Sequence, residues 1–305
     1  MDGILNVYKE PGYTSFDVVA KLRGILHQKK IGHTGTLDPQ AEGVLVVCLG
    51  KATKLCDLLP DHDKEYEATL LLGISTDTED TTGTVLEEKE VSAGEVEVRE
   101  AILSFLGDYE QIPPMYSAIK VNGQKLYELA RQGKVIERTP RPVSIYHLEI
   151  IEMKLPRVVF RIQCSRGTYI RSLCRDIGMK LGCGGCMEKL VRSKACGFSM
   201  SDSLRLTDIE RLMQENALEK KLYSIDYMYP DYPKVYMKEE WDRLVYNGNK
   251  FTKKQIGELQ EGFQNEGEED GVPPRFLVYD SKGVFLGIYE YRLKQKEFVP
   301  YKMFL

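Results

Sequence analysis

The spacing of apolar residues along the chain alternates between the period of a helix and the patterns of strands. Apolar positions three and four apart predict a helix that follows Thr14 and Ser15, either of which can cap it. The same spacing predicts a helix over residues 170–181, capped by Thr168 and ended by Gly182. Alternating or unbroken apolar runs predict strands at residues 44–49, 65–73, 143–155, 158–164, 276–280, 284–292 and 298–304.

Shorter helices are predicted between these elements. One begins at the capping box formed by Ser92 and Glu95 and runs to residue 106. Others are predicted at residues 51–59, 125–132 and 238–246, and after Thr207. Because helices and strands follow one another without a regular βαβ rhythm or an internal repeat, we predict an α+β fold.

A segment rich in proline and tyrosine, residues 227–233, divides the chain and is typical of a linker. We therefore predict a catalytic α+β domain over residues 1–226 and a small β-rich domain over residues 227–305. The smaller domain includes an acidic, glycine-rich loop at residues 257–274.

Composition is that of a soluble globular protein. Of the 305 residues, 42% are hydrophobic and 29% are charged, and the length allows one large domain and a small one. The chain lacks an apolar run of about 18 residues. Its N-terminus lacks the basic and apolar regions of a secretory signal. We expect a cytoplasmic protein that does not contact a membrane.

Charge is segregated along the chain although the net charge is only −4. Residues 57–110 contain 16 Asp or Glu and 3 Lys or Arg, whereas residues 116–175 contain 12 Lys or Arg and 4 Asp or Glu. This pattern fits a basic face that grips phosphates on an otherwise acidic protein. It fits equally well a fold in which the two segments pair their opposite charges.

The seven cysteines lie mostly in apolar surroundings, as reduced and buried thiols do. Cys183 and Cys186 have the spacing of metal ligands, but no second such pair and no suitably spaced histidine pair accompanies them. We interpret these two cysteines as part of a tight turn and expect no metal.

The segment at residues 30–43 is a glycine-rich loop with one carboxylate, Asp38, near its centre. Gly32 and Gly35 permit unusual backbone angles, and Pro39 restricts both itself and Asp38. Such a loop holds Asp38 in one orientation, as a catalytic carboxylate requires. For an arbitrary sequence of this kind, a turn stabilised by its own side chains is the simpler interpretation.

The residue types in this loop identify a motif more specifically than the spacing of its glycines, aspartate and proline does. GHTGTLDPxAxGVL resembles the active-site motif of the TruB family, the tRNA pseudouridine-55 synthases, and the resemblance extends over residues 1–226. It implies a pseudouridine synthase fold, with a mixed, largely antiparallel central sheet flanked by helices. It also implies a small C-terminal domain of the PUA-like, RNA-binding kind.

The resemblance further implies a reaction. Uridine 55 in the T-loop of tRNA is flipped out and isomerised to pseudouridine, without a cofactor. Asp38 matches the family's catalytic aspartate, which acts as nucleophile or base. Arg171 matches an arginine that pairs with this aspartate and, by two hydrogen bonds, keeps it ionised and oriented. The sequence leaves open whether the mechanism is covalent or proceeds through a glycal.

Four further positions match substrate-binding residues of the family. Tyr66 matches a tyrosine that stacks on the flipped uracil and either accepts or relays the C5 proton. Tyr169 matches a second tyrosine that contacts the substrate, and Leu190 an apolar residue that packs against the base. His33 matches a histidine that contacts the RNA where the target base leaves the stack.

Two other stretches resemble parts of the family. Residues 112–133, within an insertion at about residues 110–145, match the segment that closes over the T-arm, and their basic and aromatic residues suit RNA. Residues 76–80 match an acidic turn beside the active site. The roles of Lys9 and Asp80 stay open.

Three functions remain in view. The first is a stand-alone, monomeric tRNA uridine isomerase that needs no guide RNA. The second is a noncatalytic RNA-binding or tRNA-folding protein, for which Asp38, Tyr66 and Arg171 would be unnecessary. The third is the catalytic subunit of a guide-RNA particle, whose dyskerin-type members carry basic terminal segments that this acidic chain lacks.

Overall fold

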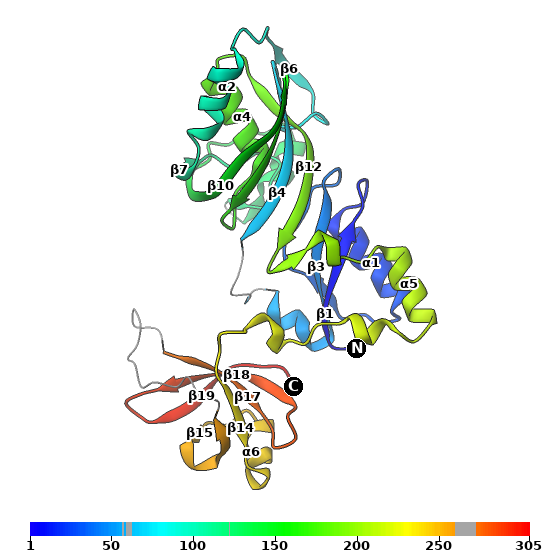
Figure 1. The fold of residues 1–305 in the computed structure, drawn as a ribbon, viewed down its shortest axis with the longest axis vertical. Helices are drawn as coiled ribbons and strands as arrows, with labels where there is room; N and C mark the ends of the chain where they lie inside the picture. The colour runs from blue at the N-terminus through cyan, green and yellow to red at the C-terminus, as the bar shows by residue number, and fades with distance from the viewer. Residues whose placement is uncertain (57, 59–62, 122, 260–272) are drawn as a thin grey trace.

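The computed structural model describes residues 1–56, 58, 63–121, 123–259 and 273–305. Figure 1 shows an elongated molecule, with a large sheet and its helices above and a second sheet below. The acidic run at residues 266–270, and most of the loop predicted at 257–274, lie outside the described residues. The start of that predicted loop belongs instead to a strand, β16 (Ile256–Leu259).

The large sheet has nine strands in the described part of the chain. In spatial order, its main path consists of β1 (Gly3–Lys9), β3 (Glu42–Leu49), β12 (Gly185–Ala195), β4 (Lys64–Leu72), β11 (Arg157–Cys164), β10 (Arg141–Lys154) and β7 (Gly107–Gln111). Two further strands, β2 (Ile31–His33) and β13 (Phe198–Ser199), pair with β3 and β12. Neighbours along the path are antiparallel except β3 and β12. The predicted mixed, largely antiparallel sheet is confirmed.

Strand β3 is buried on both faces, which explains the unbroken apolar run at residues 44–49. Its even-numbered residues pack into a core shared with the second sheet. Its odd-numbered residues pack against α1 (Ser15–Ile25) and α5 (Leu206–Gln214). Because successive side chains of a strand point to opposite faces, only an apolar run without alternation suits this position.

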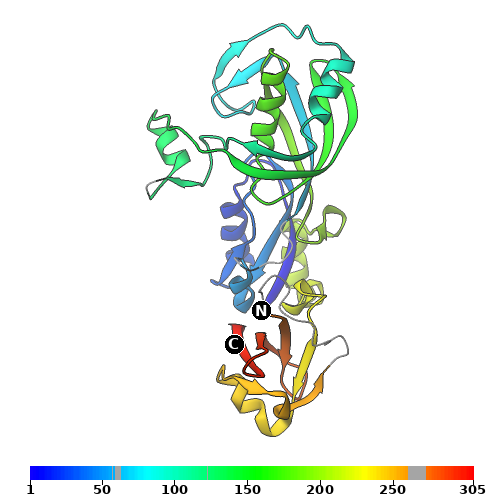
Figure 2. The ribbon, with the colours of Figure 1, turned by 90° about the vertical axis from the view of Figure 1, so that its left-hand side faces the viewer.

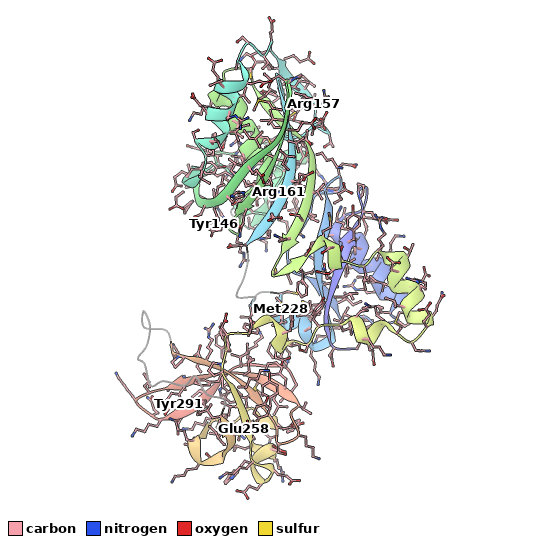
Figure 3. The ribbon with its side chains drawn as sticks, viewed as in Figure 1. Tyr146, Arg157, Arg161, Met228, Glu258 and Tyr291 are labelled. Carbon is pink, nitrogen blue, oxygen red and sulfur yellow. The ribbon has the colours of Figure 1, made fainter. Side chains whose placement is uncertain are left out.

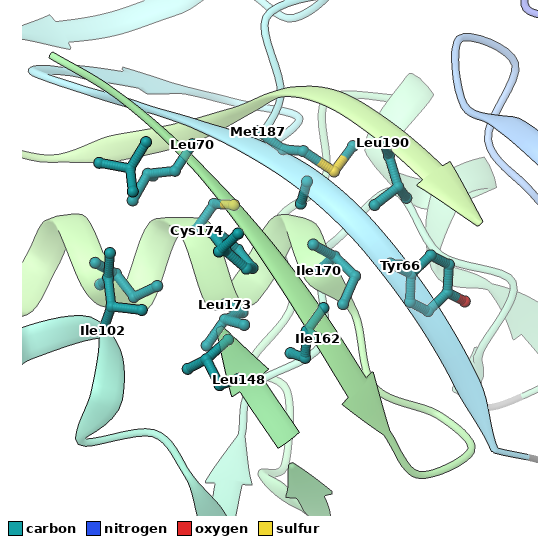
Figure 4. Packing of buried hydrophobic residues seen from close by; sticks show 14 of the residues in the cluster. Tyr66, Leu70, Ile102, Leu148, Ile162, Ile170, Leu173, Cys174, Met187 and Leu190 are labelled. Carbon is teal, nitrogen blue, oxygen red and sulfur yellow. The ribbon is translucent and has the colours of Figure 1, made fainter. Parts of the chain in front are cut away.

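Helices α2 (Glu95–Leu103) and α4 (Ile170–Lys180) pack on the part of the sheet formed by β4, β11 and β10. Figure 4 shows how side chains of α4, such as Leu173 and Cys174, lie among those of the strands. Both residues are completely buried. This core supports the end of α4 at which Arg171 lies.

The start of α1 is as predicted. The Thr14 hydroxyl accepts a hydrogen bond from the Asp17 backbone N–H at 3.0 Å, and the Thr14 N–H donates to the Asp17 carboxylate at 2.8 Å. The two bonds form a reciprocal capping box, which satisfies N–H groups that a helix leaves free at its start.

The predicted starts of α2 and α4 are wrong by one or two residues. Gly94, not Ser92, precedes α2, and its N–H donates to the Glu97 carboxylate at 2.8 Å. Tyr169 precedes α4, because the Thr168 hydroxyl donates to the Ser165 carbonyl at 2.9 Å instead of capping the helix. Helix α2 also ends earlier than predicted.

The shorter predicted helices are only partly regular. In its described part, the helix predicted at residues 51–59 is a 3-10 helix, Gly50–Leu55. The helix predicted at residues 238–246 consists of a 3-10 turn, Glu239–Trp241, followed by α6 (Asp242–Tyr246). Helix α5 begins one residue before Thr207.

The second sheet forms the predicted β-rich C-terminal unit. In spatial order, its strands are β15 (Phe251–Thr252), β19 (Glu297–Met303), β18 (Phe285–Arg292), β17 (Arg275–Tyr279), β14 (Lys234–Met237) and β16. The segment at residues 227–233 is packed rather than open, since Met228 and Tyr229 are only 5% and 3% exposed. The Tyr279 hydroxyl donates to Asp226 at 2.7 Å, so the second sheet is attached directly to the end of the first unit.

The insertion between β7 and β10 forms a projection. It contains β8 (Lys120–Val121), β9 (Gln124–Lys125) and α3 (Leu126–Arg131), and Figure 2 shows it standing out to one side of the molecule. The Lys125 ammonium and the Arg131 guanidinium lie 5.3 and 5.4 Å from the centroid of the Tyr127 ring. The projection thus carries both positive charge and an aromatic ring.

Candidate active site

Asp38 lies in the loop that connects β2 to β3. The loop is tied to the start of α1, because the Leu37 N–H donates to the Ser15 hydroxyl at 2.9 Å. It is also tied to the turn after β1, where the Gly12 N–H donates to the Pro39 carbonyl at 2.9 Å. These bonds hold the backbone on both sides of Asp38.

The side chain of Lys9 binds the backbone of the same loop. Its ammonium is completely buried and donates to the carbonyls of Pro39 at 3.0 Å, Ala41 at 2.5 Å and Glu10 at 3.2 Å. Burial lowers the pKa of Lys9 to about 8, and the nearby Asp38 carboxylate opposes this shift. Lys9 therefore acts on Asp38 through the backbone of the loop.

Replacing Lys9 with methionine should lower single-turnover activity by roughly tenfold or more, because the loop loses two hydrogen bonds and Asp38 loses its fixed position. Unmodified protein should also lose activity above pH 8 or so, where Lys9 deprotonates and has fewer N–H donors. Rates measured from pH 6 to 10 in both proteins test this. Lys21→Met, at an exposed lysine of α1, is the control; an equal loss there would contradict the assignment.

Arg171 binds Asp38 in the way that the sequence predicts. The Arg171 Nε lies 2.9 Å from Asp38 Oδ2, and its Nη2 donates to Asp38 Oδ1 at 3.2 Å. The arginine side chain is 6% exposed and that of Asp38 is 37% exposed. The carboxylate is therefore held from the protein side while it remains open to a substrate.

The same guanidinium is fixed by two backbone carbonyls. Nη1 donates to the Thr78 carbonyl at 3.1 Å, and Nη2 donates to the Tyr116 carbonyl at 2.9 Å. Burial raises the pKa of Asp38, and Arg171 lowers it, whereas the neighbouring Asp80 raises it further. Arg171, and to a smaller extent the Lys9 charge, thus favour the ionised carboxylate against the effect of burial.

Asp80, whose role the sequence leaves open, shapes the acidic turn. Its Oδ1 accepts hydrogen bonds from the Thr78 hydroxyl at 2.8 Å and from the Thr82 N–H and hydroxyl at 2.9 and 2.6 Å. Its other oxygen lies 4.0 Å from the Nε of Arg171. The turn therefore presents both a carboxylate and the Thr78 carbonyl to Arg171.

Tyr66 and Leu190 lie on adjacent strands, β4 and β12, and each is 7% exposed. They share one buried cluster with Leu37 and Ala41 from the Asp38 loop and with Ile170, the neighbour of Arg171. Figure 4 shows Tyr66 and Leu190 at the same end of this cluster. Burial raises the pKa of Tyr66 to about 12, so its phenol keeps its proton at neutral pH.

Tyr169 and His33 enter the site from two other elements. Both backbone groups of Tyr169 bind the Gln111 side chain, with the N–H donating at 2.7 Å and the carbonyl accepting at 3.0 Å. Burial raises the pKa of the Tyr169 phenol. His33 ends β2, where burial and the Arg192 charge lower its pKa, so its imidazole is neutral near pH 7.

Arg192 is a buried arginine beside the Asp38 loop to which the sequence analysis gave no role. It is 1% exposed, and it donates from Nε to the Val44 carbonyl at 2.7 Å and from Nη2 to the Gly35 carbonyl at 3.1 Å. Its backbone approaches Gly43 so closely that a Cβ at that glycine would lie 2.2 Å from the Arg192 carbonyl oxygen. Gly43 is therefore needed for the Asp38 loop to seat against β12.

Cys183 and Cys186, which have the spacing of metal ligands, lie in different elements. Cys183 falls in the turn after α4, flanked by Gly182 and Gly184 at φ of +75° and +78°, whereas Cys186 is already part of β12. Among the residues that the structure describes, no three His, Cys, Asp or Glu side chains are arranged to hold a metal ion. Over the same residues, no helix has both the length and the apolarity to cross a membrane.

Two protein-family models match this chain. Residues 23–170 match the model of the TruB family pseudouridylate synthase N-terminal domain, and residues 171–229 match that of the tRNA pseudouridylate synthase B C-terminal domain. The chain is 55% identical to tRNA pseudouridine synthase B of Lachnoclostridium phytofermentans, over 100% of both chains. It is 43% identical to the protein of that name from Staphylococcus aureus strain MSSA476, over 99% of both chains.

Two solved structures illustrate the likeness of fold. A chain of a Cbf5-Nop10-Gar1 complex is 26% identical with a TM-score of 0.72, and the match covers 99% of this chain and 85% of that one. A chain of an H/ACA RNP bound to a substrate RNA is 24% identical with a TM-score of 0.71 and the same coverage. From the matched models and the identity to full-length relatives, this chain belongs to the TruB family of pseudouridylate synthases.

Proposed function

We propose that this protein isomerises uridine 55 in the T-loop of tRNA to pseudouridine, with Asp38 as the catalytic carboxylate. The relatives named above are tRNA pseudouridine synthases, which supports tRNA as the substrate. The observation that carries the proposal is the pair of Asp38 and Arg171. A half-exposed carboxylate held by two bonds from a buried guanidinium is a group prepared to react.

In this reaction the bond between C1′ and N1 of uridine breaks, and C5 of the rotated uracil joins C1′. The C5 hydrogen then leaves and N1 gains a proton, so that atoms balance without a redox step. Asp38 acts beside the sugar and the base as nucleophile or base. Arg171 keeps the carboxylate ionised and oriented before this step.

Base flipping brings the uridine into this site. Tyr66, Tyr169 and Leu190 supply the aromatic and apolar walls against which a uracil ring packs. His33, neutral and half-buried at the edge of the Asp38 loop, contacts the RNA at the place that the base vacates. Tyr66 accepts or relays the C5 proton.

RNA binding extends beyond the pocket. We assign residues 1–226 to catalysis, with the insertion at about residues 110–145 closing over the T-arm, and residues 227–305 to a PUA-like RNA-binding unit. The Lys125, Tyr127 and Arg131 side chains of the projection suit phosphate contacts and stacking. The enzyme acts as a monomer and without a guide RNA.

The test is to incubate the purified protein with an unmodified tRNA transcript and to map pseudouridine by sequence position. We expect modification at position 55 with no other RNA present. A requirement for an added guide RNA would favour the particle subunit instead. Binding of tRNA without any pseudouridine would favour a noncatalytic RNA-binding protein.

Chelation should leave the activity unchanged, because the proposed chemistry assigns no metal to Cys183, Cys186 or the histidines. The measurement is the initial rate after exhaustive treatment with EDTA, with the zinc content of the protein determined in parallel. The control is the same treatment followed by added Mg²⁺, which separates effects on tRNA folding from effects on the enzyme. Stoichiometric zinc whose removal abolishes activity would contradict the assignment.

A further inference from the structure

Glu79, in the acidic turn, is a buried residue in an unusual conformation. It is 7% exposed and has a φ of +64°, a left-handed backbone angle that residues other than glycine rarely adopt. Its carbonyl accepts a hydrogen bond from the Met187 N–H of β12 at 3.0 Å. A strained residue of this kind persists only where its surroundings hold it in place.

The carboxylate of Glu79 is held by helix α4. Ser172 donates from its hydroxyl to Oε2 at 2.6 Å, and Arg175 forms an ion pair with Oε1. Ser172 follows Arg171 directly, and Arg175 lies one helical turn after it. Glu79 thus binds two residues of the helix, and both follow the residue that binds Asp38.

The residues on either side of Glu79 connect it to Arg171. Thr78, the residue before Glu79, supplies the carbonyl that accepts from Arg171 Nη1 at 3.1 Å. Asp80, the residue after it, places its carboxylate 4.0 Å from Arg171 Nε. Any change at Glu79 that rotates the turn therefore moves two groups that fix the Arg171 guanidinium.

Arg175 extends the contact to the insertion. Its Nη2 donates to the Ile112 carbonyl at 3.0 Å, just as Arg171 Nη2 donates to the Tyr116 carbonyl at 2.9 Å. Asp176 also binds Arg175, at 2.7 Å, so the guanidinium is shared between two carboxylates. Two arginines one turn apart on α4 thereby connect the acidic turn with the first residues of the insertion.

We propose that Glu79 and Arg175 are positioning residues, which hold Arg171 in the geometry that aligns Asp38 and link that geometry to the base of the insertion. Neither residue has a hydrogen bond or an ion pair with Asp38, and both act on it through Arg171. The catalytic readouts of this inference rest on the proposed function, because they require pseudouridine formation.

The test compares Glu79→Gln and Arg175→Gln with a control, Arg157→Gln. The control breaks the exposed ion pair between Arg157 and Glu188 at the far end of β11, where Figure 3 labels Arg157. We expect Glu79→Gln and Arg175→Gln to lower the single-turnover rate about tenfold or more, with tRNA affinity changed less than about threefold. The control variant should have the same single-turnover rate as the protein without substitutions.

A double-mutant cycle shows whether Glu79 acts through Arg171. In protein that already carries Arg171→Lys, the change Glu79→Gln should lower the rate less than about twofold further, because the geometry is already lost. A full additional loss, or an equal fall in rate and affinity, would overturn the proposal. Melting temperatures are measured for each variant. If Glu79→Gln does not fold, Ser172→Ala, which removes one contact of the carboxylate, takes its place in the cycle.

A readout without substrate separates this inference from the proposed function. The Nε–H of Arg171 is buried against Asp38, so its nuclear magnetic resonance signal should exchange slowly with water. Glu79→Gln should speed that exchange, and Arg157→Gln should not. Unchanged exchange in Glu79→Gln would refute positioning even in an active enzyme. If the protein forms no pseudouridine in tRNA, the proposed function fails while this measurement still decides the role of Glu79.

Discussion

Replacing Asp38 with asparagine is expected to abolish turnover, by at least ~10³-fold, while tRNA affinity stays within a few-fold. Asparagine has the shape of aspartate and can still accept a hydrogen bond from Arg171. It lacks the negative charge and the second acceptor oxygen, so it serves neither as nucleophile nor as base. Binding depends instead on phosphate contacts and stacking, which the substitution leaves intact.

Release of tritium from tRNA labelled at uridine C5, under single-turnover conditions, measures the chemical step, and filter binding measures affinity. Asp242→Asn is the matched control, because that carboxylate binds Ser281 in the C-terminal unit, on a different sheet. It should leave the rate of the chemical step unchanged. If Asp38→Asn released the C5 hydrogen at a comparable rate, Asp38 would not be the catalytic group.

Sequence patterns predict those helices and strands whose formation depends on residues close together in the chain. The hairpin of β10 and β11 and the helix α1 follow from apolar alternation and from a capping box, each within a few residues. Strand β12 was not predicted, although it lies at the centre of the sheet. Its sequence mixes glycine, lysine, arginine and serine, and its partners β3 and β4 lie more than 100 residues away along the chain. Tertiary pairing rather than propensity determines such a strand.

The candidate site likewise has features that the sequence predicts and features that only the fold shows. The sequence motifs were enough to identify Asp38 and Arg171 as candidate site residues. The contact between them is the one that the sequence predicts. The carbonyls of Thr78 and Tyr116 that hold Arg171 leave no trace in the sequence, because every residue carries a carbonyl. Buried cations are equally hidden, since lysine and arginine are usually exposed. Lys9 is a case in which only the fold shows the role.

Replacing Arg171 with lysine should lower the single-turnover rate about a hundredfold and change tRNA affinity by no more than a few-fold. Lysine keeps the positive charge, so long-range attraction to RNA persists. It lacks the planar fork that reaches both oxygens of Asp38 as well as the Thr78 and Tyr116 carbonyls. A carboxylate displaced by about an ångström loses rate on this scale.

The pH dependence of the same variant distinguishes orientation from mere proximity of charge. Arg171 lowers the pKa of Asp38 against the effect of burial, so weakening the contact raises that pKa. The acid limb of the rate profile should therefore move to higher pH in Arg171→Lys, because a higher pH is then needed to ionise Asp38. Arg157→Lys, at the exposed pair on β11, should leave the limb in place. Equal losses of rate and affinity with an unmoved limb would make Arg171 an RNA contact rather than the partner of Asp38.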